Sequence, residues 1–170
     1  MNKVVTSALY LLLCLLSFHC ISAQKKKASK TTIILVRHAE KDTIGGNNPP
    51  LSVEGSARAK RLAASFPNVV PDEFYATPFI RTVSTLKPWA DAVGKEVKTY
   101  AAADSIKLTE TLLKQQGKTI VVTGHSNTIP ILVNLLIGTK KYKTLPDSAY
   151  SNIYVVTVAS GKATEKVLHY

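Results

Sequence analysis

The sequence predicts an α/β domain in which helices cover both faces of a mostly parallel sheet. Short apolar runs rich in β-branched residues alternate along the chain with segments whose apolar residues have helical spacing. This alternation is typical of parallel sheets, because each helix carries the chain back to the start of the next strand. The 170 residues, 45% of them hydrophobic, fit a single core and exclude a disordered chain.

The first expected strand is residues 31–36 (TTIILV), an apolar run typical of a strand buried on both faces. A loop rich in Gly, Asn and Pro follows at residues 45–50. Ser52 predicts the start of a helix that ends at Pro67. The apolar face of this helix consists of residues at i, i+3, i+4 and i+7: Ala59, Leu62, Ala63 and Phe66. Residues 73–76 predict a second short strand.

A second helix is expected at residues 80–93, where Pro88 should bend or shorten it and Gly94 should end it. The remaining elements are expected in this order: a strand at 96–100, a helix at 103–116 closed by Gly117, a strand at 119–123, a helix at 127–137 ending at Gly138, and strands at 153–159 and 166–169 in a hairpin around Ser160 and Gly161. A helix follows each of the first four strands, which is the order that a parallel sheet needs.

The N-terminus predicts a secretory signal peptide at residues 1–23. Lys3 precedes an almost purely apolar run at residues 8–18, and Ala23 is a small residue at the expected cleavage point. Residues 24–30 (QKKKASK) then form a basic linker, and residues 31–170 form the folded domain. We therefore expect the mature protein in the periplasm or outside the cell, with no stable membrane insertion.

Two other interpretations of this segment stay open. Lipid attachment at Cys20 is less favoured, because His19 stands where lipoprotein signals have a small residue. An uncleaved membrane anchor is disfavoured by the same polar His19. The only cysteines are Cys14 and Cys20, so the sequence excludes a disulfide scaffold and a four-cysteine zinc site.

The formal net charge of +11 favours acidic partners, such as phosphate compounds, nucleic acid or anionic lipid. We expect no nucleic-acid binding, because the lysines are scattered and no basic motif is interleaved with aromatic residues. A small phosphorylated substrate remains the favoured partner.

Basic side chains stand where strands of the predicted sheet end. Arg37 and His38 follow the first strand, His125 follows the fourth, and Arg81 lies near the start of the helix after the second. Ligands of α/β sheets bind beyond the carboxyl ends of the strands, so we expect these four side chains in one crevice. Such a crevice fits a dianionic phosphoryl group, which a neutral imidazole can attack while arginines hold its oxygens.

A metal centre is the main alternative interpretation of this crevice. His38 and His125 could be two ligands with Glu40 as a third. The flanking arginines would repel a cation, so we expect neither a metal nor another cofactor.

The segment Leu35-Val36-Arg37-His38-Ala39-Glu40 resembles the Arg-His-Gly/Ala motif of the histidine phosphatase superfamily, which includes the cofactor-dependent phosphoglycerate mutases. The resemblance continues, in the family's order, through three further groups of residues: Leu51-Ser52 with Gly55, Arg58 and Ala59; Thr77-Pro78 with Arg81 and Thr82; and Val122-Thr123-Gly124-His125-Ser126-Asn127. It implies a three-layer α/β/α sandwich around a central mixed sheet.

The resemblance also implies roles for individual residues. His38 would be the nucleophile that becomes phosphohistidine, while Arg37, Arg81 and His125 would bind the phosphoryl group and stabilise its transfer. Glu40 and Ser126 are further candidates for substrate binding.

This sequence departs from the family at the general acid, the residue that protonates the leaving group. Many members place a Glu after the third strand, and others place an Asp directly after the second histidine, where this chain has Ser126. Asp104 is the only carboxylate near the third strand, and its alternative role is to cap the following helix. Glu40 is a second candidate, with loop orientation as its alternative role. If neither serves, the enzyme would resemble phosphohistidine phosphatases that lack an acid.

We therefore expect an exported phosphomonoester hydrolase that acts through a phosphohistidine on His38. The mature chain has little room for the insertions of the larger mutases. The alternatives are a phosphate-ligand-binding module of the same fold with weak or no catalysis, and a phosphohistidine-type phosphatase without a general acid.

Overall fold

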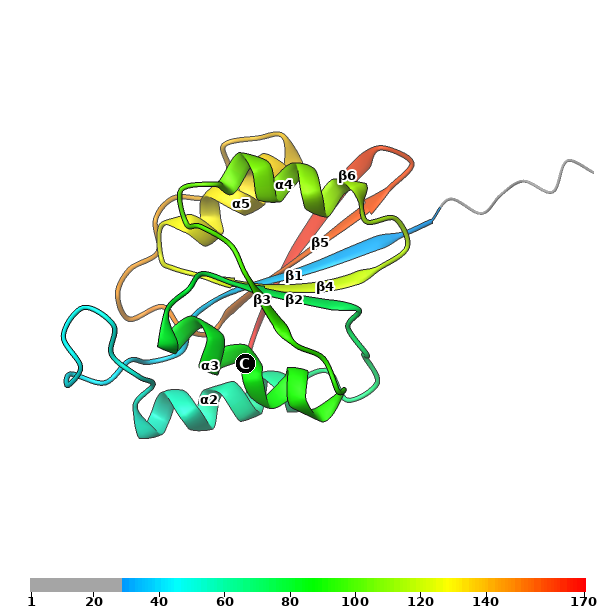
Figure 1. Cartoon of the computed structure of the whole chain (residues 1–170). Coiled ribbons are helices and arrows are strands. Elements are labelled where there is room, and N and C mark those ends of the chain that lie inside the picture. The colour runs from blue at the N-terminus through cyan, green and yellow to red at the C-terminus, as the bar shows by residue number, and fades with distance from the viewer. Residues whose placement is uncertain (1–28) are drawn as a thin grey trace, which may run out of the picture.

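The computed structural model describes residues 29–170, which form a six-stranded mixed sheet with helices on both sides (Figure 1). The strands are β1 (Thr31–Arg37), β2 (Glu73–Ala76), β3 (Val97–Thr99), β4 (Thr119–Gly124), β5 (Asn152–Ala159) and β6 (Lys162–His169). Their order across the sheet is β3-β2-β4-β1-β5-β6. The pairs from β3 to β1 are parallel, whereas β5 is antiparallel to both β1 and β6. The expected mostly parallel sheet is confirmed.

Four helices complete the α/β/α sandwich. They are α2 (Val53–Ala64), α3 (Ile80–Ala92), α4 (Ser105–Lys114) and α5 (Thr128–Ile137). In Figure 1, α2 and α3 lie on one face of the sheet, and α4 and α5 lie on the other. Each face has its own apolar core, so the central strands are buried on both sides.

Alternate residues of β1 supply the two cores. Ile33 and Leu35 pack against α4 and α5, while Ile34 and Val36 face α2 and α3. All four side chains are at most 2% exposed. This burial explains why the strand has an unbroken apolar sequence and fixes its register against β4.

Most expected elements agree with the structure to within a few residues at each end. Ser52 is the N-cap of α2 and accepts a hydrogen bond from the backbone N–H of Gly55. Gly138 ends α5 in the left-handed conformation, at φ 71°. The last two strands form the expected hairpin, with positive φ at Ser160 and Gly161.

Pro88 does not shorten its helix as expected. It lies inside α3, which continues to Ala92. Leu86, Trp89 and Ala90, on either side of the proline, are at most 3% exposed. This packing stabilises the turns that would otherwise be weakened by the missing N–H donor.

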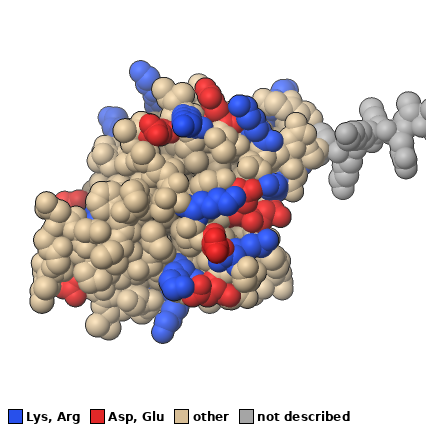
Figure 2. Space-filling model, in the orientation of Figure 1, with Lys and Arg blue, Asp and Glu red and all other residues tan. Residues whose placement is uncertain are grey.

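The expected signal peptide, the possible lipid site at Cys20 and most of the expected basic linker lie outside the described residues. Within residues 29–170, no helix is long and apolar enough to cross a bilayer. On the face seen in Figure 2, basic and acidic side chains are interspersed.

Candidate active site

The two histidines lie together at the carboxyl ends of the central strands β1 and β4. Arg37, the last residue of β1, pairs with Gly124 at the end of β4. The backbone N–H of His38 then donates to the Gly124 carbonyl over 2.9 Å. The rings of His38 and His125 consequently meet edge to face, with centroids 5.4 Å apart. The parallel register of the two strands is what brings these distant sequence positions into one site.

A backbone hydrogen bond sets the tautomer of His38. Its Nδ1 lies 2.8 Å from the carbonyl oxygen of Ala39. Because a carbonyl only accepts, Nδ1 carries the proton and Nε2 keeps a free lone pair. The backbone N–H of Ala39 donates to Thr85 Oγ1, which fixes the peptide that holds the ring. His38 is therefore held as a neutral imidazole with Nε2 ready to act as a nucleophile.

The surroundings of His38 also favour its neutral form. The side chain is buried, and burial lowers the pKa of His38 to about 4. The hydrogen bond to Ala39 opposes this shift, while the charges of Arg81, His125 and Arg37 add to it. The lone pair on Nε2 is consequently available at neutral pH.

His125 is held by contacts on several sides. Its Nε2 lies 3.0 Å from Thr77 Oγ1, and its backbone N–H donates to Thr128 Oγ1. The ring of Phe79 meets the imidazole edge to face at 5.1 Å. Burial, together with the charges of Arg81 and Arg37, lowers the pKa of His125 to about 4. With Nε2 directed at Thr77, Nδ1 is the nitrogen left for a ligand.

Arg81 brings buried donors that lack a partner. Its Nε and Nη1 are buried and have no hydrogen-bond acceptor among residues 29–170. The guanidinium lies over the ring of Phe79, with Cζ 4.5 Å from the ring centroid. Burial lowers the pKa of Arg81, but an arginine remains charged at every physiological pH. Unpaired N–H groups on a buried cation are costly unless an anion binds them, so Arg81 marks an anion site.

Arg37 divides its donors between the protein and the same site. Nη1 donates to the carbonyl oxygens of Pro146 and Asp147, at 2.8 and 3.0 Å. The Nε of Arg37 is buried and has no acceptor within the described part of the chain. Tyr150 stacks on the guanidinium, with Cζ 4.2 Å from its ring centroid. Arg37 thus holds the loop before β5 and keeps one donor for a ligand.

Comparisons with known proteins agree with this geometry. The family model described as histidine phosphatase superfamily (branch 1) matches residues 33–109, which include Arg37, His38 and Arg81. Residues 33–109 therefore match this superfamily, and the match covers a little under half of the 170 residues. No curated protein matches the chain.

Solved phosphatases share the fold at low sequence identity. The protein histidine phosphatase SixA complexed with tungstate is 18% identical, with a TM-score of 0.66 over 81% of this chain and 96% of its own. A phosphoserine phosphatase mutant from Entamoeba histolytica, in complex with phosphoserine, is 16% identical, with a TM-score of 0.63 over 80% and 95%. A mycobacterial glucosyl-3-phosphoglycerate phosphatase with inorganic phosphate is 14% identical, with a TM-score of 0.67 over 82% and 97%.

Glu40 is paired with Arg58 of α2. The distance from Arg58 Nη2 to Glu40 Oε1 is 2.6 Å, and Arg58 Nε donates to both carboxylate oxygens. Burial raises the pKa of Glu40, but hydrogen bonds and charge from Arg58 outweigh it and leave the pKa below its usual value. Of the roles considered for Glu40, this pairing supports orientation of the loop, because a carboxylate held ionised is a poor proton donor.

The same loop explains Gly55 in α2. A Cβ on Gly55 would lie 2.0 Å from the carbonyl oxygen of Glu40, which is closer than any real contact. That carbonyl also accepts from the backbone N–H of Ser52. Ser52, Gly55 and Arg58 therefore fix the segment that follows His38.

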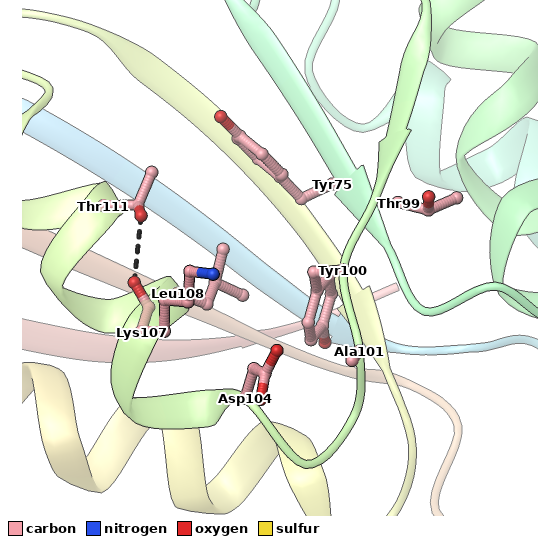
Figure 3. Close-up of a pocket in the computed structure, with 8 residues that line it drawn as sticks. All are labelled: Tyr75, Thr99, Tyr100, Ala101, Asp104, Lys107, Leu108 and Thr111. Carbon is pink, nitrogen blue, oxygen red and sulfur yellow. Dashed lines mark hydrogen bonds between the residues drawn. The ribbon is translucent and has the colours of Figure 1, made fainter.

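Asp104 lies in a cavity beside α4 (Figure 3). The volume is about 280 Å³, and the lining residues are Tyr75, Thr99, Tyr100, Ala101, Asp104, Lys107, Leu108 and Thr111. None of the four basic residues of the site is among them. Asp104 occupies the N-cap position of α4, although its side chain makes no capping hydrogen bond. For Asp104, the structure therefore shows neither the side-chain cap of α4 nor a place among the four basic residues of the site.

Ser126, a predicted residue, and two tyrosines complete the description of the site. The carbonyl oxygen of Ser126 accepts from the backbone N–H of Leu145, which ties the loop before β5 to the site. Tyr150 lies against the site, its ring 6.2 Å from that of His38. Tyr142 instead packs on Tyr154. Within residues 29–170, no cluster of three or more His, Cys, Asp or Glu residues has the geometry of a metal site.

Sequence reasoning assigned no role at this site to Thr77 or to Tyr150. Thr77 stands in a motif that had been matched to the family, but its contact with His125 depends on the pairing of β2 with β4. The contact of Tyr150 with Arg37 depends on the path of the long loop before β5, whose sequence has no periodic pattern. For Tyr150, an aromatic residue just before a strand beside the site was the only available signal.

Proposed function

We propose that this protein is a phosphomonoester hydrolase that forms a phosphohistidine on His38. The observation that carries the proposal is a nucleophilic nitrogen beside a cation with unpaired buried donors. The Nε2 of His38 has a free lone pair, and Arg81 beside it has two buried donors that lack partners among residues 29–170. A phosphoryl dianion satisfies both features at once.

The reaction proceeds in two displacements at phosphorus. The Nε2 lone pair of His38 attacks, the bond from phosphorus to the leaving oxygen breaks, and phosphohistidine forms. Water then attacks the same phosphorus from the side that the leaving group vacated. The N–P bond breaks, its electron pair returns to Nε2, and inorganic phosphate leaves.

Fixed positive charge supports both displacements. Arg81 donates through Nε and Nη1 to the phosphoryl oxygens, and Arg37 donates through Nε. His125 donates from Nδ1 when its Nε2 accepts from the Thr77 hydroxyl, or when the ring is protonated. These donors are in place before the reaction, so they stabilise the developing charge without reorganisation.

A second candidate is a phosphohistidine-type phosphatase that cleaves bonds needing no general acid. The placement of the two candidate acids favours it, because Arg58 holds Glu40 ionised and Asp104 lines a separate cavity. SixA, a structural neighbour, is a protein histidine phosphatase. A phosphoramidate nitrogen or a nitrophenolate leaves readily, so substrates of these kinds suit such a site.

Export remains part of the proposal. It is supported by the sequence of residues 1–23, with its lysine, apolar run and small residue before Gln24. Determination of the N-terminus of the protein recovered from the periplasm or medium tests this point. A first residue of Gln24 is expected, and recovery of the intact chain from the cytoplasm would contradict export.

Phosphate release by the purified full chain tests the activity. The panel contains p-nitrophenyl phosphate, alkyl phosphates and phosphohistidine, and the controls are His38→Ala and the exposed-surface variant Lys60→Ala. We expect the parent protein and Lys60→Ala to release phosphate, and His38→Ala to be inactive. Tight phosphate binding by calorimetry without turnover of any substrate would instead favour the binding module.

A further inference from the structure

We propose that the hydroxyl of Tyr150 is the proton donor to the leaving group. This assignment rests on the proposed function and identifies the acid that the sequence left open. It also extends the substrate range from activated esters to ordinary alkyl phosphates, whose leaving oxygen must gain a proton as it departs.

Tyr150 is the aromatic side chain that links the nucleophile to Arg37. Its ring lies 6.2 Å from the His38 ring and covers the guanidinium of Arg37 at 4.2 Å. The phenol oxygen accepts from Nη2 of Arg37 over 3.4 Å. A phosphoryl group held by the free Nε of Arg37 would therefore have the Tyr150 hydroxyl close to its oxygens.

The proton of Tyr150 has no competing use. Among the described residues, Tyr150 accepts one hydrogen bond and donates none. A phenol keeps its proton at neutral pH, unlike a carboxylate, and can donate it to an oxygen whose negative charge is increasing. The adjacent Arg37 cation stabilises the phenolate that remains after transfer.

The carboxylates near the site are less suitable. Arg58 holds Glu40 in its ionised form, and Asp104 lines the cavity beside α4. Asp147 has Oδ1 3.7 Å from Arg37 Nη2, but its side chain is fully exposed to water. Tyr150 is half-buried and stacked on Arg37. Its hydroxyl is therefore better positioned for proton transfer than the Asp147 carboxylate.

The proton follows a closed cycle. As His38 Nε2 bonds to phosphorus, the bond to the leaving oxygen breaks and that oxygen takes the Tyr150 proton, so an alcohol leaves. In the second displacement, the phenolate accepts a proton from the attacking water while the N–P bond breaks. Phosphate is released, and both His38 and Tyr150 return to their starting states.

The leaving-group dependence of the first displacement tests the proposal. Enzyme in excess is mixed with p-nitrophenyl, phenyl and alkyl phosphates, and the single-turnover rate of leaving-group release is measured for the full chain and for Tyr150→Phe. We expect Tyr150→Phe to change the rate less than about threefold with p-nitrophenyl phosphate and to lower it about 100-fold with alkyl phosphates.

Matched variants separate the hydroxyl from other causes. Tyr142→Phe removes a hydroxyl from the same loop and should leave the leaving-group dependence unchanged, because Tyr142 packs on Tyr154. Tyr150→Leu removes the stack on Arg37 as well and should slow all substrates. Asp147→Asn should follow the parent protein across the series.

The outcomes distinguish this proposal from the function on which it rests. Equal losses for all leaving groups in Tyr150→Phe would assign Tyr150 to positioning alone and overturn the proposal. A steeper dependence in Asp147→Asn would transfer the role to Asp147 and would overturn it too. In both cases the parent protein still releases p-nitrophenol, so the proposed function would stand. No release by the parent protein would remove both proposals.

Discussion

The Nε2 atom of His125 lies 3.0 Å from the Oγ1 atom of Thr77, a fully buried side chain at the end of β2. Thr77 Oγ1 also lies 3.1 Å from Thr82 Oγ1, whose own proton is directed to the carbonyl oxygens of Thr77 and Phe79. The single proton of Thr77 thus serves either Thr82 or His125. Thr77 is a positioning residue that fixes the orientation of the His125 ring.

Replacement of Thr77 by Val should lower kcat about tenfold and alter its pH profile, because the hydroxyl that orients His125 is lost while the side-chain volume is kept. Thr77→Ser should restore most of the activity. Steady-state kinetics from pH 5 to 9 checks this, and an unchanged pH profile with lowered activity would indicate a merely structural role for Thr77.

Removal of Arg81 should raise the barrier to phosphoryl transfer by at least about 3 kcal/mol, comparable to the loss of an oxyanion donor. Its buried Nε and Nη1 have no hydrogen-bond partner among residues 29–170. The ratio of kcat/KM for the parent protein and Arg81→Ala measures this loss. Arg61→Ala, on the surface of α2, serves as the control, and a near-normal rate for Arg81→Ala would contradict the proposed pocket.

The two histidines should make stability depend on pH. Burial lowers the pKa of both His38 and His125 from 6.5 to about 4 in the folded protein. Between these pH values the unfolded chain binds more protons, so the free energy of unfolding should fall as the pH is lowered from about 6.5 towards 4.

Urea denaturation from pH 5 to 7 measures this dependence above the range in which the carboxylates titrate. The double variant His38→Asn/His125→Asn should show a much shallower slope than the parent protein. An equal slope in both proteins would mean that other groups are responsible.

Substitution of Gly55 should disturb the loop that follows His38. Because a Cβ would lie 2.0 Å from the Glu40 carbonyl oxygen, Gly55→Ala should lower the free energy of unfolding by about 1–3 kcal/mol and also reduce turnover. Chemical denaturation and kinetics check both effects. Ser56→Ala, at the next and exposed position of α2, should be close to the parent protein.

The sequence predicted the fold and the four basic residues of the site because both depend on local patterns. Apolar runs locate the strands, and Arg37, His38 and His125 follow directly from their ends. The pairing of β1 with β4 then brings the two histidines together without help from longer loops.

The remaining features depend on contacts between distant segments. The pairing of Glu40 with Arg58 and the stacking of Tyr150 on Arg37 join residues 18 and 113 positions apart. Pro88 illustrates the same limit, because packing of its neighbours lets α3 continue past Pro88 to Ala92 where local propensity predicts a shorter helix. Asp104 fits two local patterns, that of a helix cap and that of a general acid. Its position in a cavity that none of the four basic residues lines depends on the fold and could not be read from either pattern.

Detection of the phosphorylated residue tests the central claim most directly. The full chain is mixed with p-nitrophenyl phosphate, quenched at alkaline pH, where phosphohistidine survives, and digested for mass spectrometry. The account predicts phosphate on His38 in the parent protein and none in His38→Ala. Phosphate release by His38→Ala at the parent rate, or a phosphorylated residue other than His38, would contradict it.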